Sequence, residues 1–307
     1  MARKFKFKYA VIALATGAFA VGSDYIVQGD TPVAMLSTGA EISPFEGEEI
    51  DRELDDGNTG ASKVLLVGTH VTMTIPVELA GSGTNTLPVP YSPLVQICGR
   101  DEVAGASDVT HTRIIDGSEK DATIYFYLDG AVHKVTGCRA KMSIAGKTGE
   151  LAKTTFEVTG LYQGVASNTF VKPNVAAFQT PAPIGNASTT FSLDGNNYVL
   201  KSFEFNDGNE VEYADNVGGE KVDITDFNPD GTITIEAPDP DDFNPFDVAE
   251  AHALMPISLT HGSAAGNQVN IASPNIQLGR PSHEEINGTV CYSLPFKFID
   301  DFVITTS

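Results

Sequence analysis

The segment from Ala122 to Tyr162 constrains the fold more than any other, because its pattern predicts four short β-strands joined by turns that contain glycine. Apolar and polar residues alternate from Ile124 to Asp129, the period of two that turns one face of a strand toward a core. Asp129-Gly130 then predicts a tight hairpin turn, since glycine adopts a positive φ without steric cost. We expect the other strands at residues 132–135, 139–144 and 154–162, with a turn at Gly137. The segment therefore predicts a β protein.

Turn-forming residues are frequent along the whole chain, which has 29 glycines and 17 prolines among 307 residues. This composition is typical of a folded, turn-rich β protein, and the length allows two ordinary domains or one large β domain. We expect a strand pair at residues 62–67 and 71–79 around Gly68, and an acidic loop at residues 30–60. Two short helices are predicted, one at residues 90–98 with Ser92 as N-cap and Pro93 in the first turn, the other at residues 242–254 with Asn244 as cap and Pro245 as opening residue.

The two halves of the chain repeat the same order of elements. Residues 71–77, VTMTIPV, align with residues 231–237, GTITIEA, and each segment precedes a helix that opens with proline. Residues 135–161 align with residues 271–297 without gaps, which places Phe156 opposite Tyr292 and Val158 opposite Leu294. The predicted organisation is therefore two tandem β domains, residues 1–165 and residues 186–307, joined by a proline-rich linker at residues 166–185. Each domain is expected to be a β-sandwich or barrel with one short packed helix.

The formal net charge is −21. A sequence-reading nucleic-acid binder needs a basic footprint for phosphates, so this charge argues against that class. The same charge suits a surface past which DNA slides, although acidity is also common among ordinary soluble proteins. No run of about 18 apolar residues is present, so no transmembrane helix is expected.

No arrangement of residues predicts catalysis, a cofactor or a metal site. The six histidines are scattered, and neither an HExxH motif, a P-loop nor a GxSxG elbow is present. The acidic run Asp239–Asp242 matches no calcium loop, and carboxylates before a helix are explained by the helix dipole. Cys98, Cys138 and Cys291 are widely spaced, which predicts buried thiols in a reducing compartment. We therefore expect neither an enzyme nor a cofactor.

Several short motifs carry a family resemblance. They are YFYLDG at residues 125–130, GLY at 160–162, VELAGSG at 77–83, SLTHG at 258–262 and CYSLPF at 291–296. In their order along the chain these motifs resemble those of siphophage major tail proteins, the subunits of the phage tail tube. The resemblance implies trimeric rings with pseudo-sixfold symmetry, stacked into a hollow tube around the tape-measure protein. Tail terminator and tip proteins would be further partners. DNA would pass through the bore without specific binding, because an acidic chain can provide a bore that repels phosphate. The location would be the virion, after assembly in the bacterial cytoplasm.

The charge distribution predicts contacts between subunits, because complementary potentials orient association. Residues 41–60 and 207–219 resemble the loops that stack one ring of the family on the next. The predicted basic contacts are Lys4, Lys6, Lys8, Arg139, Lys141 and Lys147, and the predicted acidic contacts are Glu48, Glu49, Asp51, Glu210 and Glu212. If these contacts form, reversing Lys141 and Lys147 to glutamate should block polymerisation and leave the monomer folded.

The first 22 residues allow a second interpretation. Their basic start, apolar middle and small residues have the outline of a secretory signal peptide, whereas the strict alternation from Lys4 to Tyr9 is typical of a strand. The alternative function is accordingly a secreted or cell-surface β-sandwich protein, an adhesin or carbohydrate-binding module. An intact mass that retains Met1 or Ala2 would favour the tube, and cleavage near residue 20 would favour export.

Overall fold

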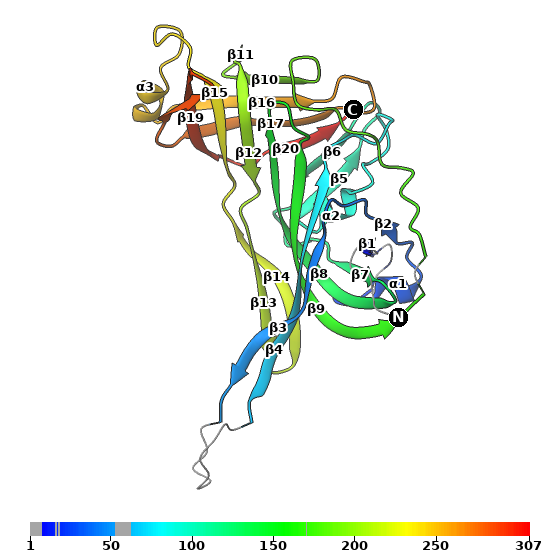
Figure 1. Cartoon of the computed structure of the whole chain (residues 1–307). Helices are drawn as coiled ribbons and strands as arrows, with labels where there is room; N and C mark the ends of the chain where they lie inside the picture. The colour runs from blue at the N-terminus through cyan, green and yellow to red at the C-terminus, as the bar shows by residue number, and fades with distance from the viewer. Residues whose placement is uncertain (1–7, 16, 18, 53–62, 170) are drawn as a thin grey trace.

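The protein is almost entirely β-structure, in a computed structural model that describes residues 8–15, 17, 19–52, 63–169 and 171–307. One large sheet has 18 strands, and β13 and β14 form a separate two-stranded sheet (Figure 1). The strands are β1 (Lys8–Leu14), β2 (Val33–Ala34), β3 (Glu41–Ile50), β4 (Leu65–Glu78), β5 (Arg100–Ala104), β6 (Val109–Arg113), β7 (Ala122–Leu128), β8 (Ala131–Lys147), β9 (Lys153–Ser167), β10 (Thr189–Leu193), β11 (Asn196–Asn197), β12 (Leu200–Asn206), β13 (Asn209–Asn216), β14 (Gly219–Phe227), β15 (Asp230–Glu236), β16 (Leu254–His261), β17 (Val269–Leu278), β18 (Ser282–Ile286), β19 (Thr289–Phe298) and β20 (Val303–Thr306). The helices are α1 (Tyr25–Gln28), α2 (Ser92–Gln96) and α3 (Pro245–Glu250). The prediction of a mainly β fold is confirmed.

The central segment contains three strands, where the sequence pattern predicted four. The hairpin at Asp129-Gly130 is confirmed, because Leu128 pairs with Ala131 and both turn residues have positive φ. The turn predicted at Gly137 is wrong. Gly137 has a φ of 58° inside the continuous strand β8, at a β-bulge in the pairing with β9. A bulge uses the same glycine conformation as a turn but lets the strand continue.

Two other predictions about the first half also need correction. Gly68, with a φ of 64°, lies inside the single strand β4 and does not separate two strands. The acidic stretch from Glu41 to Ile50 is the strand β3, paired with β4, where a loop was expected. The carboxylates of β3 stay exposed while its backbone groups are satisfied by the ladder, so acidity and strand structure are compatible here.

The two predicted helices are present but differ in detail. Ser92 is not the N-cap of α2: Tyr91 holds that position, and the Ser92 hydroxyl bonds Glu102 and His111 instead. For α3 the prediction is confirmed, because the Asn244 side chain accepts a hydrogen bond from the Phe246 amide at 3.1 Å. The helix ends at Glu250, earlier than the predicted residue 254.

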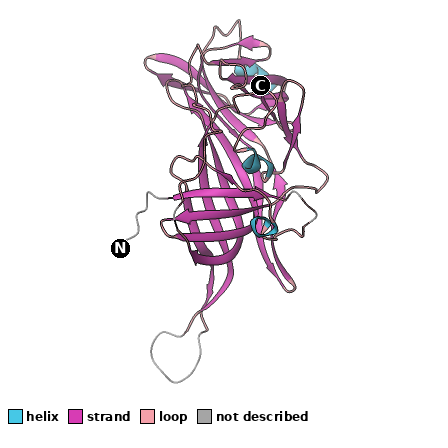
Figure 2. Ribbon diagram, turned by 90° about the vertical axis from the view of Figure 1, so that its right-hand side faces the viewer, coloured by secondary structure: helices cyan, strands magenta, loops and turns pink. Residues whose placement is uncertain are grey.

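Two runs of antiparallel neighbours make up most of the large sheet. The first run has the order β1, β7, β8, β9, β4 and β3. The second has the order β10, β16, β17, β19, β15 and β12. Strand β12 pairs with the end of β8, and β20 pairs with both β17 and β6. These pairings make the two runs one continuous sheet, whose long strands extend along the molecule (Figure 2).

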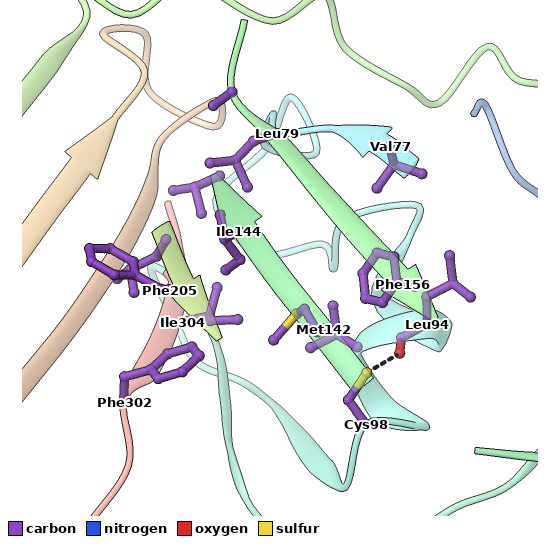
Figure 3. Close-up of a cluster of buried hydrophobic side chains, with 14 of the residues drawn as sticks. Val77, Leu79, Leu94, Cys98, Met142, Ile144, Phe156, Phe205, Phe302 and Ile304 are labelled. Carbon is purple, nitrogen blue, oxygen red and sulfur yellow. Dashed lines mark hydrogen bonds between the residues drawn. The ribbon is translucent and has the colours of Figure 1, made fainter. Parts of the chain in front are cut away.

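The hydrophobic core is shared between the two runs. Phe156 of β9 lies near Leu94 of α2, and Ile144 of β8 lies near Ile304 and Phe205 from the second half of the chain, with Phe302 on the same side of the cluster (Figure 3). All three cysteines are buried and free, as predicted. The core therefore lies on one side of strands β4, β8, β9 and β12, and the other side of these strands is not part of it.

Strand β1 is an internal part of the sheet. Residues Lys8–Leu14 lie between β2 and β7, and Ala10 and Ile12 are completely buried. This segment belongs to the stretch with the outline of a signal peptide. The alternation predicted from Lys4 onward begins outside the described residues, so only its end, at Lys8 and Tyr9, is placed as a strand. Over the described ranges, none of the helices has the length and apolar character required for a bilayer span.

Candidate assembly surface

Two long hairpins extend from the same end of the molecule, and we call them the arms (Figure 1). The first arm is the outer part of β3 and β4, residues 45–50 and 65–70, and the second arm is β13 with β14. Gly47 is required in the first arm, because a Cβ there would lie 2.6 Å from the Val67 carbonyl oxygen. The second arm closes at Val217-Gly218, because Asn216 of β13 pairs with Gly219 of β14.

Aromatic side chains connect the arms to each other and to the sheet. The His70 ring stacks on the Tyr213 ring, with 4.8 Å between centroids, and Phe45 packs edge-on against Tyr162 of β9. His70 Nδ1 lies 2.9 Å from the Gly68 carbonyl oxygen, and its Nε2 lies 3.9 Å from Glu46. The arms are therefore held side by side.

The groove between the arms combines carboxylates with apolar side chains. Glu46, Glu48, Glu212 and Asp215 line it together with Phe45, Ile50, Val67, Val211 and Tyr213. Large apolar side chains are also exposed along the arms, among them Phe45, Ile50, Leu65, Leu66 and Val217. Several exposed apolar side chains gathered on two projecting hairpins are typical of an interaction surface. The arms therefore have the chemistry of a protein-binding surface with an acidic border.

A buried polar network anchors the second arm to the body. The Asp207 carboxylate accepts hydrogen bonds from the Met142 amide at 2.9 Å and from the Asn209 side chain at 3.0 Å. Asn209 also donates to the Cys98 carbonyl oxygen at 2.9 Å and accepts a bond from Arg113. Burial raises the pKa of Asp207 to about 6, although the amide bonds and the charges of Arg100 and Arg113 oppose the shift. The base of the arm is thus fixed by a group that titrates close to neutral pH.

The predicted acidic contacts lie on the arms. Glu48 and Glu49 are exposed on β3 and Asp51 is exposed just beyond it, while Glu210 and Glu212 are exposed on β13. The structure thus brings together the two segments that the sequence singled out separately, residues 41–60 and 207–219. Part of the first segment, residues 53–60, lies outside the described residues.

The predicted basic contacts are more dispersed. Lys141 pairs with Glu157 of its own chain at 2.8 Å, and both lie in a groove with Glu210 and Glu212. Arg139 is only 6% exposed and donates to the Lys120 carbonyl oxygen at 3.1 Å. Lys147 is exposed at the end of β8 and Lys8 begins β1, whereas Lys4 and Lys6 lie outside the described residues.

Glycine-containing loops of the two halves contact each other, and this contact was not predicted from the sequence. The Gly81 amide donates to the Asn267 side chain at 2.7 Å, and the Gly83 amide donates to the Gly266 carbonyl oxygen at 2.7 Å. A Cβ on Gly266 would lie 2.6 Å from the Gly83 carbonyl carbon. The VELAGSG motif thus contacts the loop that follows SLTHG. The glycines of these two segments are the sequence feature that could have indicated a close backbone contact here.

The described residues show no arrangement suited to catalysis. Ser92, His111 and Glu102 lie together, but Ser92 bonds both partners, and Ser92 and His111 are about 1% exposed or less. In a nucleophilic triad the carboxylate instead orients the histidine, whose other nitrogen faces an accessible serine. The residues that the structure describes also contain no group of three or more His, Cys, Asp or Glu side chains that could hold a metal ion. Ser92, His111 and Glu102 therefore form a structural polar network.

These features define a class: a mainly β structural protein with projecting arms. A family model described as phage tail tube protein matches residues 14–298, so the chain belongs to this family. It is a structural, non-enzymatic subunit of the phage tail tube, a component of the virion, and its family implies self-assembly into a tube. A search of curated proteins finds no match to the chain. The family match favours the tube prediction over the surface adhesin.

Proposed function

We propose that the chain polymerises as stacked rings around the tape-measure protein and that the tube later conducts DNA. Each subunit is proposed to contain two tandem tube domains, residues 1–165 and 186–307, joined by residues 166–185. A trimer of such subunits has six similar domains around its axis, which gives a ring with pseudo-sixfold symmetry.

The observation that carries this proposal is a repeated register. Ile75 pairs with Phe156 in the ladder of β4 with β9, and Ile235 pairs with Tyr292 in the ladder of β15 with β19. These are the residues that the sequence alignment of the two halves makes equivalent, and all are buried. A slip of one residue would turn each core side chain to the other face of the sheet, so a shared register is a stringent match. The equal strand order of the two runs supports the same conclusion.

The gapless alignment of residues 135–161 with residues 271–297 does not match the structure at one hairpin, where the two halves have turns of different length. Residues between Lys147 and Lys153 connect β8 to β9, whereas β18 reaches β19 through the two-residue turn Asn287-Gly288. Strands β17 and β18 both pair with β19, as the single strand β8 pairs with β9. The proposed duplication therefore includes a shortened turn and an interrupted strand in the second domain.

The arms are the proposed contacts between successive rings. Their exposed apolar side chains would bury area on a neighbour, and Glu48, Glu49, Asp51, Glu210 and Glu212 would meet basic groups there. Lys4, Lys6 and Lys8 are the basic candidates from the start of the chain. The partners at the tube ends are proposed to be the terminator and tip proteins, and assembly is proposed to take place in the host cytoplasm.

Electron microscopy of the purified full-length chain tests the proposal. We expect hollow filaments at high protein concentration, and averaged views down the axis should show six similar densities made by three chains. Solid aggregates, or a chain that remains monomeric under all polymerising conditions, would reject ring assembly. Rings of six chains would retain the tube and reject the trimer of duplicated domains.

A further inference from the structure

The second arm is joined to the body of the molecule through a narrow pivot. Strand β12 passes into β13 through Asp207-Gly208, and β14 passes into β15 through Asn228-Pro229. The Asn228 amide donates a hydrogen bond to the Gly208 carbonyl oxygen at 2.9 Å, so the two connections are in direct contact. Gly208 has a φ of 62°, and a Cβ there would lie 2.1 Å from the Asn228 carbonyl oxygen. Only glycine therefore fits at this position of the pivot.

The two arms differ in how they leave the large sheet. The first arm is the outer part of β3 and β4, and β4 continues from it into the core without interruption. Strands β13 and β14 instead form their own two-stranded sheet, and the ladder of β12 with β15 ends at the pair of Asn206 and Asp230. A groove of about 500 Å³ is lined by residues of β13 together with β4, β8 and β9. Backbone pairing therefore fixes the direction of the first arm, whereas side chains must fix the direction of the second.

Arg113, at the end of β6, contacts both strands of the second arm at its base. Its guanidinium group donates a hydrogen bond to the side-chain oxygen of Asn209, and the guanidinium carbon lies 4.1 Å from the centroid of the Phe227 ring. Asn209 is the first residue of β13, Phe227 is the last residue of β14, and the two are partners in the ladder. The face of an aromatic ring attracts a cation electrostatically. Arg113 therefore binds the first cross-strand pair of the arm.

The segment that follows α2 makes room for this contact at Gly99. Gly99 has a φ of 75°, and a Cβ there would lie 3.3 Å from Ile224 of β14 and 3.5 Å from the Arg113 guanidinium carbon. Arg113 also donates a hydrogen bond to the carbonyl oxygen of the preceding residue, Cys98, at 3.2 Å. The segment Cys98-Gly99 of the body therefore lies against both the guanidinium group and the arm.

The position of Arg113 is costly for its positive charge. Burial and the neighbouring charge of Arg100 lower the pKa of Arg113, because both disfavour the guanidinium cation. The hydrogen bond to Asn209 and the contact with the Phe227 ring offset part of this cost. The Asn209 side chain in turn donates to the Asp207 carboxylate at 3.0 Å, so Asn209 connects the two charged groups. The arm therefore supplies much of what makes this position tolerable for an arginine.

We infer that Arg113 is the positioning residue of the second arm and holds β13 and β14 in the direction in which they meet the next ring. This inference rests on the proposed function, in which the arms join successive rings. A binding surface that is ordered before association loses less conformational freedom when it binds. An arm released at its base has to be ordered by the next ring instead. Loss of Arg113 therefore weakens stacking although the exposed surface of the arm is unchanged.

Arg113→Met tests the inference in two measurements. In the monomer, spin labels at Val217→Cys on the arm and Asp241→Cys on the body, both exposed positions, should give a narrow distance distribution with Arg113 and a broad one with Arg113→Met. The native cysteines are buried and contribute little labelling. The critical concentration for polymerisation should rise by roughly tenfold to a hundredfold, the equivalent of one hydrogen bond to a charged group. A narrow distribution in the variant would overturn the inference, and so would an unchanged critical concentration.

Two further variants separate positioning from a general loss of stability. Phe227→Leu removes the aromatic ring from the arm and leaves the body unaltered, so it should broaden the same distribution even if Arg113→Met does not fold. Arg139→Met is the matched control, because Arg139 is also a buried arginine that donates to a backbone carbonyl oxygen, that of Lys120 at 3.1 Å, away from the arm. It should lower the free energy of unfolding in urea without broadening the distribution. Equal broadening in all three variants would reject a specific role of Arg113.

The inference and the proposed function fail in different measurements. If the unaltered chain forms no tubes, the proposed function is rejected, and the distance distribution of the monomer still decides whether Arg113 holds the arm. If the unaltered chain forms tubes and the distribution stays narrow in Arg113→Met and in Phe227→Leu, the proposed function stands and the positioning role is rejected.

Discussion

His70 of the first arm stacks on Tyr213 of the second, with 4.8 Å between the ring centroids and 20° between the ring planes. Replacing Tyr213 with alanine should release the second arm from the first. Aromatic pairs contribute about 0.5–1.5 kcal/mol beyond the area they bury, so we expect a loss of that size in the free energy of unfolding. Amide hydrogen exchange in β13 and β14 should accelerate, and tube formation should fall because the arms no longer hold one arrangement.

The matched control for this prediction is Tyr213→Phe. The Tyr213 hydroxyl is buried without a hydrogen-bond partner among the described residues, so the phenyl ring should retain the stack without losing a polar contact. If exchange in β13 and β14 is the same in Tyr213→Ala as in Tyr213→Phe, the stack does not hold the arms together.

The buried ion pair between Arg100 and Asp301 should be essential for stability. Arg100 donates to both carboxylate oxygens of Asp301 at 2.9 Å and to the Phe302 carbonyl oxygen at 2.7 Å. Asp301→Ala leaves a buried guanidinium without its counter-ion, so we expect a loss of about 3–5 kcal/mol in urea unfolding.

Lys297→Ala provides the comparison for that ion pair. Lys297 and Asp230 are also paired, at 3.3 Å, but both are nearly half exposed. An exposed pair contributes at most about 1 kcal/mol, so its loss should be small. Equal losses in Asp301→Ala and Lys297→Ala would contradict the importance of the buried pair.

The raised pKa of Asp207 predicts a pH dependence of stability. Its pKa is about 6 in the folded chain against a reference of 3.8, so between these values the folded state binds more protons than the unfolded state. The contribution of Asp207 to the free energy of unfolding is therefore fully present below pH 3.8 and is lost as pH rises through about 6. A shift of this size corresponds to roughly 3 kcal/mol, to order of magnitude.

Urea titrations at pH 4, 5, 6 and 7 can isolate this contribution by comparison with Asp207→Asn, which cannot ionise. Relative to that variant, the unaltered chain should lose stability as the pH rises over this range. The comparison removes the pH effects of the other carboxylates. A constant difference between the two proteins would show that Asp207 has an ordinary pKa.

Gly266→Ala should disrupt the contact between the two halves. Gly266 has a φ of 81°, and an added Cβ would lie 2.6 Å from the Gly83 carbonyl carbon. The substitution therefore combines left-handed strain with a backbone clash, and we expect a loss of several kcal/mol, beyond the roughly 1–3 kcal/mol of strain alone.

Gly195→Ala is the control for that clash. Gly195 has a φ of 74°, but no atom lies within 4 Å of its added Cβ. It should show only the strain of the left-handed conformation. If thermal unfolding shifts equally for both alanine variants, close approach at Gly266 is not what requires glycine there.

Local features were predictable from the sequence where one residue pair decides the structure. The Asp129-Gly130 hairpin and the Asn244 cap depend on neighbours in the chain, and both are confirmed. Gly68 and Gly137 were interpreted as turns because a positive φ serves turns and bulges equally. Only the partner strand distinguishes the two, and β3 pairs with β4 on both sides of Gly68.

The assembly surface was predictable only in its composition. Acidic stretches around Glu48 and Glu212 are visible in the sequence, but their meeting through His70 and Tyr213 depends on residues far apart in the chain. The side chain of Arg139 illustrates the same limit, since its charge suggested a surface contact whereas its position in the sheet buries it. Charge can be counted from a sequence, but burial and register arise only when distant strands pair.

Strand β4 begins in the first arm at Leu65 and continues into the core without interruption to Glu78, paired with β9 from His70 onward. A pull on the arm along this strand acts parallel to it, so the load falls on many cross-strand hydrogen bonds at once. Bonds loaded together in shear resist rupture better than bonds opened one after another. A tail that bends during infection would thus transfer mechanical tension from the projecting arm directly into the strand that runs through the core of the subunit.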